Sequence, residues 1–180
     1  MSTALAPGRH SVGPDSGSLR VKTYREGVAA KVGHDLVLEV GAWEATVQSG
    51  DAGTSIELTA DSTSLRVLSG ERGVKPLTEK DRDEIRHTID AKVLRRQPIT
   101  FRSTSVRSAD GGLAVDGELT IGDTTQPVSA RLELGADGRL TGTIPVVQSQ
   151  WGIKPYRGLM GALKVRDDVE IVVDARLPAG

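Results

Sequence analysis

Apolar and polar residues alternate along most of this chain with a period of two, which is the pattern of β-strands that bury one face. The alternation is clearest over residues 113–121, 128–134 and 169–175. It recurs over residues 18–24, 42–48, 54–60, 99–106 and 140–147, with a longer and mostly apolar stretch at 28–40. Turns that contain glycine and aspartate separate several of these runs, as at 110–112 and 136–138. Short strands joined in this way predict an antiparallel meander, as in a barrel or a sandwich.

Each alternating run also predicts which residues point into the protein, because successive side chains leave a strand on opposite faces. We expect the inward positions to be Ile56, Leu58, Phe101, Leu113, Val115, Leu119, Val128, Ala130, Leu132, Val169, Ile171 and Val173. We expect the charged neighbours to face water, namely Glu57, Arg102, Asp116, Glu118, Arg131, Glu170 and Asp174. A register slip of one residue would exchange the two sets.

Residues 77–94 break the alternation and repeat apolar positions at helical spacing instead. Ile85, Ile89 and Val93 fall on one face of such a helix. Thr78 is suited to cap its N-terminus, and Pro98 would prevent it from continuing. We therefore expect one α-helix over residues 78–94, inserted between two sets of strands, with its narrow apolar stripe packed across one mouth of the barrel.

The length of 180 residues fits a single domain of ordinary size. Residues 1–17 are rich in Gly, Pro and Ser, which predicts a flexible N-terminal tail and leaves residues 18–180 as the β-barrel domain. The first residues show no apolar run of signal-peptide length. No stretch approaches the ~20 apolar residues of a transmembrane segment. We therefore expect a cytoplasmic protein without a transmembrane segment.

The charge and composition narrow the classes of partner and chemistry. With 23 Lys and Arg against 24 Asp and Glu, the formal net charge is −1, without the basic excess of most nucleic-acid-binding proteins. We therefore expect no nucleic-acid partner. The chain has no cysteine, which excludes disulfides, cysteine nucleophiles and thiolate metal sites. Aromatic residues make up only 3%, so the core has to be built from aliphatic side chains.

No motif indicates a catalytic centre, since the chain has no GxSxG elbow, no P-loop and no GxGxxG turn. The three histidines, His10, His34 and His87, are isolated from one another in the sequence. We therefore expect no catalytic residue, no metal and no cofactor, and a protein that is not an enzyme. His34 interrupts an apolar run and allows two interpretations: a buried histidine that fixes a bend by hydrogen bonds, or a polar contact for a ligand headgroup.

The segment 150–161 is too long for a tight hairpin and too apolar to be left in water. It contains Trp151, Tyr156, Leu159 and Met160, with three glycines among them. It can be a plug that closes one end of the barrel or a lid that an apolar ligand touches, and one loop can do both. We expect these four side chains to cluster at one barrel mouth, with Trp151 responding when a ligand binds.

Five pieces of the chain, in this order, resemble the YceI-like, polyisoprenoid-binding family. They are the Gly33-His34 element, the acidic helix followed by Pro98-Ile99-Thr100-Phe101-Arg102-Ser103, the run Val115-Asp116-Gly117-Glu118-Leu119-Thr120-Ile121, the turn Thr124-Thr125-Gln126-Pro127-Val128 and the block Trp151-Gly152-Ile153. The resemblance covers about residues 18–177. It implies an all-β fold, an eight-stranded antiparallel lipocalin-like β-barrel with one inserted helix. It also implies that a long isoprenoid chain is held in an internal channel.

Three functions follow for such a barrel. The first is binding of a hydrophobic small molecule (a polyisoprenoid, a quinone or another lipid-like chain) as carrier, store or sensor. The second is a barrel with a filled core that serves as an interaction module or a homodimer, and the third is an enzyme with a polar cluster deep in the barrel. For the first, the expected ligand contacts are His34, Trp43, Ile56, Leu58, Phe101, Leu113, Val115, Leu119, Leu132, Trp151, Tyr156, Leu159, Met160 and Ile171.

Overall fold

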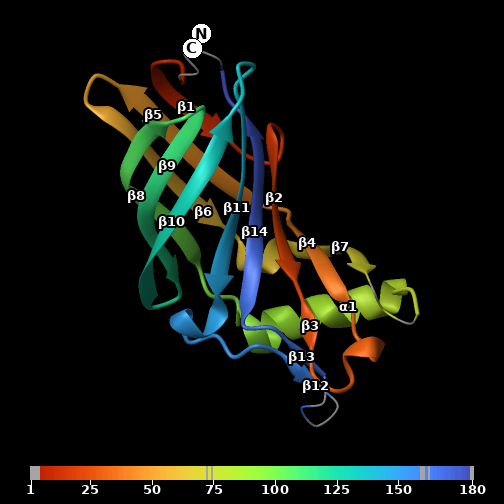
Figure 1. Ribbon diagram of the computed structural model, residues 1–180. Helices are drawn as coiled ribbons and strands as arrows, with labels where there is room; N and C mark the ends of the chain where they lie inside the picture. The colour runs from red at the N-terminus through yellow and green to blue at the C-terminus, as the bar shows by residue number, and fades with distance from the viewer. Residues whose placement is uncertain (1–4, 72, 74, 159–160, 162, 179–180) are drawn as a thin grey trace.

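The computed structural model describes residues 5–71, 73, 75–158, 161 and 163–178, and its main feature is one curled antiparallel sheet (Figure 1). The strand order is β1-β5-β6-β8-β9-β10-β11-β14-β2-β4-β7. The strands are β1 (Gly8–Val12), β2 (Gly17–Thr23), β4 (Asp35–Val40), β5 (Trp43–Gly50), β6 (Gly53–Ala60), β7 (Leu65–Glu71), β8 (Ile99–Ala109), β9 (Gly112–Ile121), β10 (Thr124–Leu134), β11 (Arg139–Val147) and β14 (Asp168–Arg176).

A second, three-stranded sheet lies at the lower end of the molecule in Figure 1. Its order is β12 (Arg157–Gly158), β13 (Leu163–Val165) and β3 (Arg25–Glu26). The chain termini lie at the opposite, upper end. Short helical turns complete the chain: η1 (Ala30–Val32), η2 (Ser62–Ser64) and η4 (Gln148–Trp151).

The all-β architecture with one inserted helix is confirmed, whereas the number of strands differs from the eight that were expected. The main sheet has 11 strands. Two of the additional strands are β1 and β7, which lie at its two edges. These two strands were not singled out in the sequence, although Val12 of β1 and Leu65 and Val67 of β7 are buried. β1 also lies within the segment that was expected to be a flexible tail, and its residues 8–12 pair with β5 instead.

The registers of the long strands agree with the alternation of the sequence. Every expected inward residue except Leu113 lines the interior cavity described below. Leu113 is buried within the main apolar cluster instead. The outer face carries the charged neighbours, which form cross-strand pairs such as Arg102–Glu57 at 3.6 Å and Arg107–Asp116 at 3.1 Å.

The expected helix is present as α1 (Glu79–Thr88), extended by the π-helical turn η3 (Ile89–Val93). Thr78 caps it: the Thr78 hydroxyl accepts from the Asp81 N–H at 3.1 Å, and the Asp81 carboxylate accepts from the Thr78 N–H at 2.9 Å. This reciprocal capping box satisfies two backbone donors. A π-helical turn adds one residue per hydrogen-bonded loop, so a plain 3.6-residue period does not predict it.

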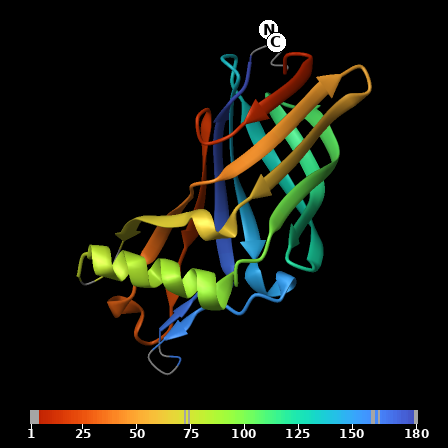
Figure 2. The same ribbon diagram turned by 180° about the vertical axis from the view of Figure 1, so that it is seen from behind.

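The helix lies against the open edge of the sheet at β7 (Figure 2). The Arg82 guanidinium donates to the Val67 and Leu68 carbonyls at 3.1 and 3.0 Å. The apolar stripe, including Ile85 and Ile89, packs on the core. The helix was expected to pack across one mouth of the barrel, and it lies along the β7 edge instead, where it covers backbone groups that an edge strand would leave unpaired.

We expect the substitution Thr78→Ala to lower the free energy of unfolding by about 1 kcal/mol, the usual cost of a lost N-cap. Urea unfolding followed by circular dichroism measures the change. Thr78→Ser keeps a hydroxyl in the same place and is the matched control. Equal losses in the two variants would contradict a role for the capping hydrogen bond.

Candidate ligand-binding cavity

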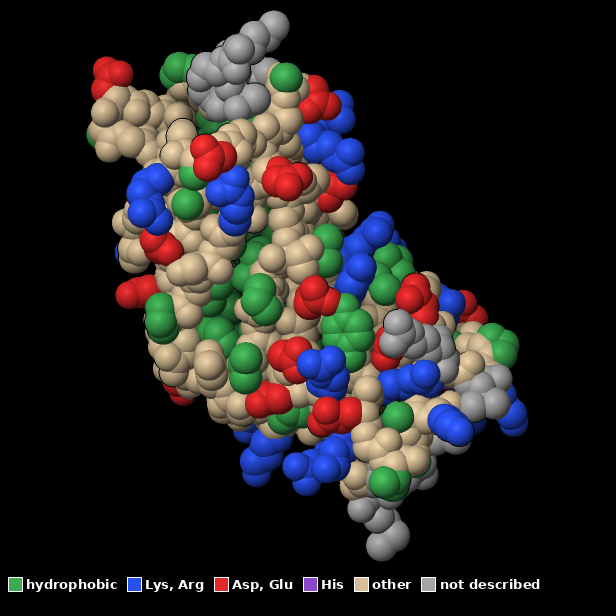
Figure 3. Space-filling view, in the orientation of Figure 1, with side chains coloured by type: hydrophobic (Ala, Val, Ile, Leu, Met, Phe, Trp, Pro, Cys, Tyr) green, Lys and Arg blue, Asp and Glu red, His purple; other side chains and the backbone are tan. Residues whose placement is uncertain are grey.

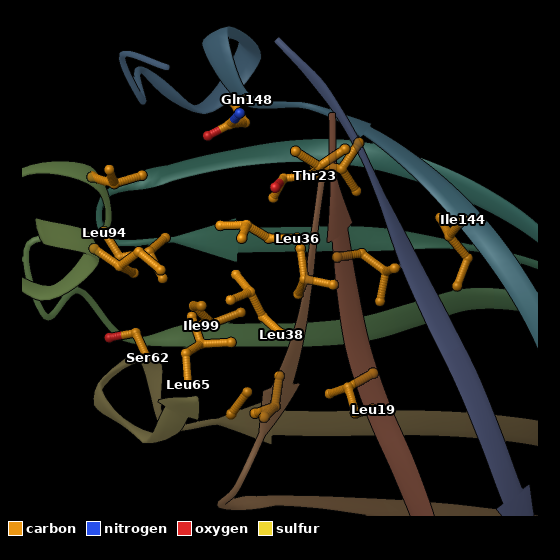
Figure 4. A pocket seen from close by; sticks show the side chains of 18 of the residues that line it. Leu19, Thr23, Leu36, Leu38, Ser62, Leu65, Leu94, Ile99, Ile144 and Gln148 are labelled. Atoms are coloured by element: carbon orange, nitrogen blue, oxygen red, sulfur yellow. The ribbon is translucent and has the colours of Figure 1, made fainter. Parts of the chain in front are cut away.

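The curled sheet encloses an elongated cavity of about 750 Å³. Nearly every strand of the main sheet contributes an inward side chain, and α1 contributes Ile85 and Ile89. In Figure 4 the side chains of Leu19, Leu36, Leu38, Ile99 and Ile144 project into one common space. The wall is therefore built from aliphatic side chains that converge from strands far apart in the sequence.

The side chains of the wall differ in how far they are buried. Val47, Leu140 and Leu177 line the cavity and are only 3, 5 and 3% exposed. Along the middle of the wall, Ile56, Leu58 and Leu119 point inward and yet are only partly buried. Among the described residues no large side chain is less than 2% exposed. A barrel with a solid core would bury these side chains fully, so this wall surrounds space that side chains do not occupy.

Most of the expected contact residues come together around this space. Those that line the cavity are His34, Trp43, Ile56, Leu58, Phe101, Val115, Leu119, Leu132, Tyr156 and Ile171. Leu113 and Trp151 do not line it, and Leu159 and Met160 lie outside the described residues. The predicted contacts are placed correctly mostly where they lie on strands, because the alternation shows which side chains point inward. The 150–161 loop has no such period, so its contacts could not be placed in this way.

The expectation that Trp151 touches the channel is corrected by its position. Trp151 closes the turn η4 and is 4% exposed. Its indole N–H donates to the Leu119 carbonyl at 2.8 Å, and its ring packs with Ile121 and Val169 in a second apolar cluster. Because both the ring and its polar atom are satisfied by the protein, Trp151 anchors the loop to the barrel wall.

The sequence interpretation missed several wall residues. Leu36 and Leu38 of β4 line the cavity, as do Leu77 and Leu94 at the two ends of the helix. The two β4 residues belong to the stretch 28–40, in which an apolar–polar alternation is present only over residues 35–40 and the residues before it show none. The apolar stripe of the helix, which was expected to pack across the mouth, was the signal that could have identified Leu94.

Polar side chains gather at the lower end, which we call the mouth and define by Arg25, His34, Lys75, Tyr156 and Lys164, all on the cavity wall. His34 Nε2 lies 2.5 Å from the Lys75 carbonyl oxygen, so this nitrogen carries the proton and donates. The ring lies so close to the backbone that a Cβ added at Gly73 would be 2.0 Å from Nε2. His34 is only partly buried and also lines the cavity, so both interpretations of this residue stay predictions.

Arg25 and Asp35 form the second polar contact of the mouth. The Asp35 carboxylate is buried and accepts from the Arg25 backbone N–H at 2.9 Å. The Arg25 guanidinium donates to the Gly33 carbonyl at 3.0 Å and lies 3.9 Å from the same carboxylate. A buried carboxylate is stable in this position because a charge and a backbone donor both compensate it. The contact fixes the chain where β2 passes into the small sheet.

Tyr24 connects the small sheet to the main one. Its hydroxyl donates to the Glu170 carboxylate on β14, and the Arg166 guanidinium lies 5.9 Å above its ring. The hydrogen bond to Glu170 raises the pKa of the Tyr24 phenol above its usual value of 10.0, and partial burial acts in the same direction. Loss of the phenolic proton would place two negative groups side by side.

The folded protein should therefore hold the Tyr24 proton more tightly than the unfolded chain does. This contribution to stability is present below pH 10.0 and is lost as the pH rises through the raised pKa of the folded state. In a Tyr156→Phe background, the ultraviolet absorbance of tyrosinate reports on Tyr24 alone. We expect its midpoint above 10.0, and a shift back toward that value when Glu170→Ala removes the acceptor. An unchanged midpoint would contradict the coupling.

The two tryptophans should respond differently to a ligand in the cavity, because Trp43 lines it and Trp151 does not. In the variant Trp151→Phe, we expect the emission of Trp43 to shift when geranylgeraniol, a long isoprenoid alcohol, is added. In the matched variant Trp43→Phe, the emission of Trp151 should stay constant. A response of Trp151 alone would contradict this placement of the two rings.

The described residues contain no group of three or more His, Asp or Glu side chains that could hold a metal ion. In the same part of the chain, no helix has the length and hydropathy that a membrane crossing requires.

Several solved structures share this fold. BcnA of Burkholderia cenocepacia is 17% identical, with a TM-score of 0.60, over 87% of this chain and 94% of that one. The YCEI protein of Campylobacter jejuni is 12% identical, with a TM-score of 0.55, over 79 and 84% of the two chains. A structure from Saccharophagus degradans, described as a polyisoprenoid binding domain, is 10% identical, with a TM-score of 0.55, over 97 and 100%.

At these identities the structural likeness establishes the fold alone. A search among curated proteins finds no match. The family profile described as "YceI-like domain", however, matches residues 18–177, which is most of the chain and includes the whole cavity wall apart from Val12. The chain therefore belongs to the family of YceI-like domains.

Proposed function

We propose that this protein binds a long hydrophobic molecule, a polyisoprenoid, a quinone or another lipid-like chain, along the axis of its cavity, as carrier, store or sensor. The observation that carries the proposal is the aliphatic cavity of about 750 Å³. Its size falls within the roughly 300–1,000 Å³ of small-molecule sites in proteins. The neighbour described as a polyisoprenoid binding domain supports the same class of ligand.

The physical basis of the proposed binding is the transfer of methylene groups out of water. Each buried CH₂ contributes about 0.8 kcal/mol, so each five-carbon unit contributes about 4 kcal/mol before the costs of ordering the chain. Figure 4 labels Thr23, Ser62 and Gln148 as polar side chains of the wall, and further polar and charged side chains line the cavity at the mouth and along the helix. The Gln148 amide already donates to the Arg166 carbonyl at 3.1 Å. Such a wall selects a ligand by its apolar length and cross-section.

We propose a binding role in preference to catalysis, because two polar side chains of the mouth, His34 and Arg25, are engaged in fixing the backbone. The Lys75 carbonyl accepts from His34, and Arg25 contacts Asp35 and the Gly33 carbonyl. The second function, a barrel with a filled core acting as an interaction module, requires an interior without space. The partly buried inward residues of the wall favour the first function over it. A homodimer stays a prediction.

Native mass spectrometry of freshly purified protein, followed by lipid extraction, tests the proposal directly. We expect an apolar molecule to copurify, or delipidated protein to bind geranylgeraniol with a one-to-one stoichiometry. Protein that neither copurifies with an apolar molecule nor takes up any long-chain probe would contradict the proposal.

A substitution that fills the cavity should abolish this uptake without unfolding the protein. Ala130 of β10 lines the cavity, whereas Ala114 on the neighbouring strand β9 does not. We expect Ala130→Trp to reduce geranylgeraniol binding at least tenfold, because the indole ring occupies the space of the chain. Ala114→Trp adds the same ring on the other face and is the matched control. Equal binding by both variants would place the ligand outside the cavity.

A further inference from the structure

The end of the molecule that carries the mouth differs in charge from the rest. The small sheet and its flanking segments, residues 25–34 and 154–166, carry six cationic side chains and one carboxylate. The cations are Arg25, Lys31, Lys154, Arg157, Lys164 and Arg166, and the carboxylate is Glu26. Two of these cations are paired with carboxylates just outside the two ranges, Arg25 with Asp35 and Arg166 with Asp168. The other four leave this end with a positive excess, although the whole chain has a formal net charge of −1. Figure 3 shows Lys and Arg side chains gathered toward this lower end.

The same end presents apolar side chains to water. Val28, in the turn before η1, is 94% exposed, and Tyr156, before β12, is 40% exposed. Among the described residues these are the exposed large hydrophobic side chains, and both lie in the segments that carry the cations. Single exposed apolar residues are common on protein surfaces. Here they coincide with a positive cluster and with the opening of an apolar cavity.

The two segments form one surface because their strands pair. Arg157 of β12 pairs with Lys164 of β13, and Lys164 pairs with Glu26 of β3. Directly paired residues point to the same face of a sheet, so these three side chains form one row. η1, which follows Val28 and contains Lys31, contacts β13. An apolar tip surrounded by cationic side chains is the combination that binds at the interface of a lipid bilayer.

We propose that this end, which we call the basic tip, docks on the surface of a bilayer that contains anionic phospholipid. Val28 enters the headgroup region and the surrounding lysines and arginines contact lipid phosphates. The mouth then opens onto lipid. This inference adds a membrane as a partner to the proposed function. It depends on that function only in explaining why docking is useful: a long apolar chain is costly to move through water.

Charge alone would equally attract a nucleic acid or an acidic protein. The phosphates of a nucleic acid, however, gain nothing from contact with an exposed valine. The apolar side chain therefore favours a lipid surface. Each cationic side chain near such a surface adds an attraction that salt screens. Binding should accordingly weaken with rising ionic strength and disappear on vesicles without anionic lipid.

Cosedimentation of delipidated protein with vesicles tests the inference. We expect binding to vesicles of phosphatidylcholine and phosphatidylglycerol, and little binding to phosphatidylcholine alone. The double variant Lys31→Glu with Lys154→Glu should bind at least tenfold more weakly, and Val28→Asp severalfold more weakly. None of these three residues lines the cavity, so geranylgeraniol uptake should be unchanged in both variants and serves as the test of folding.

Matched controls lie at the opposite end of the barrel. Ala52→Asp changes an exposed residue of the β5–β6 turn, and Arg9→Glu with Arg107→Glu reverses two cations of the main sheet. Both controls should bind the mixed vesicles as the unaltered protein does. Absence of vesicle binding at low salt, or equal losses in variants and controls, would overturn the inference while leaving uptake in the cavity untouched. The charge-reversed variant could lose binding to both vesicles and DNA while Val28→Asp still binds both. The basic tip would then bind polyanions in general, and this result would also overturn the inference.

Discussion

The contact between α1 and the β7 edge is the constraint on which the rest of the structure depends. A curled sheet that does not pair its last strand with its first leaves backbone groups unpaired along the opening. Here Arg82 donates to two carbonyls of β7, while the apolar stripe of the same helix faces inward as part of the cavity wall. One helix therefore satisfies an edge strand on its polar side and encloses an apolar space on the other.

Because the helix closes the wall, the strands do not have to do so by filling the interior. Their inward side chains are aliphatic and reach only part of the way across, so the space along the axis persists. The mouth is organised differently, by contacts of charged and polar groups with backbone atoms. Asp35 accepts from the Arg25 N–H, and His34 donates to the Lys75 carbonyl. These contacts between neighbouring segments keep a polar rim in place around an apolar opening.

The parts of this structure that were predictable from the sequence are those where a period exists. Ile56, Leu58 and Val115 were assigned to the wall correctly because a strand with one wet face shows its alternation openly. Leu36 and Leu38 of β4 were not assigned, because the alternation of this strand covers only residues 35–40 within a longer, mostly apolar stretch. Trp151 was misplaced for another reason. The sequence indicates that a large apolar residue in a loop is buried, but only the tertiary fold determines which residues it packs against.

The unfilled interior has a consequence for how the protein persists in a cell. Side chains that face a cavity lack partner atoms on one side, and the packing contacts that a solid core would supply are missing. A molecule bound along the axis would supply them, and it would stabilise the folded state by an amount that grows with the logarithm of its concentration once that concentration exceeds the dissociation constant. Under the proposed function, the lifetime of the chain against proteolysis would then report on the supply of the bound molecule.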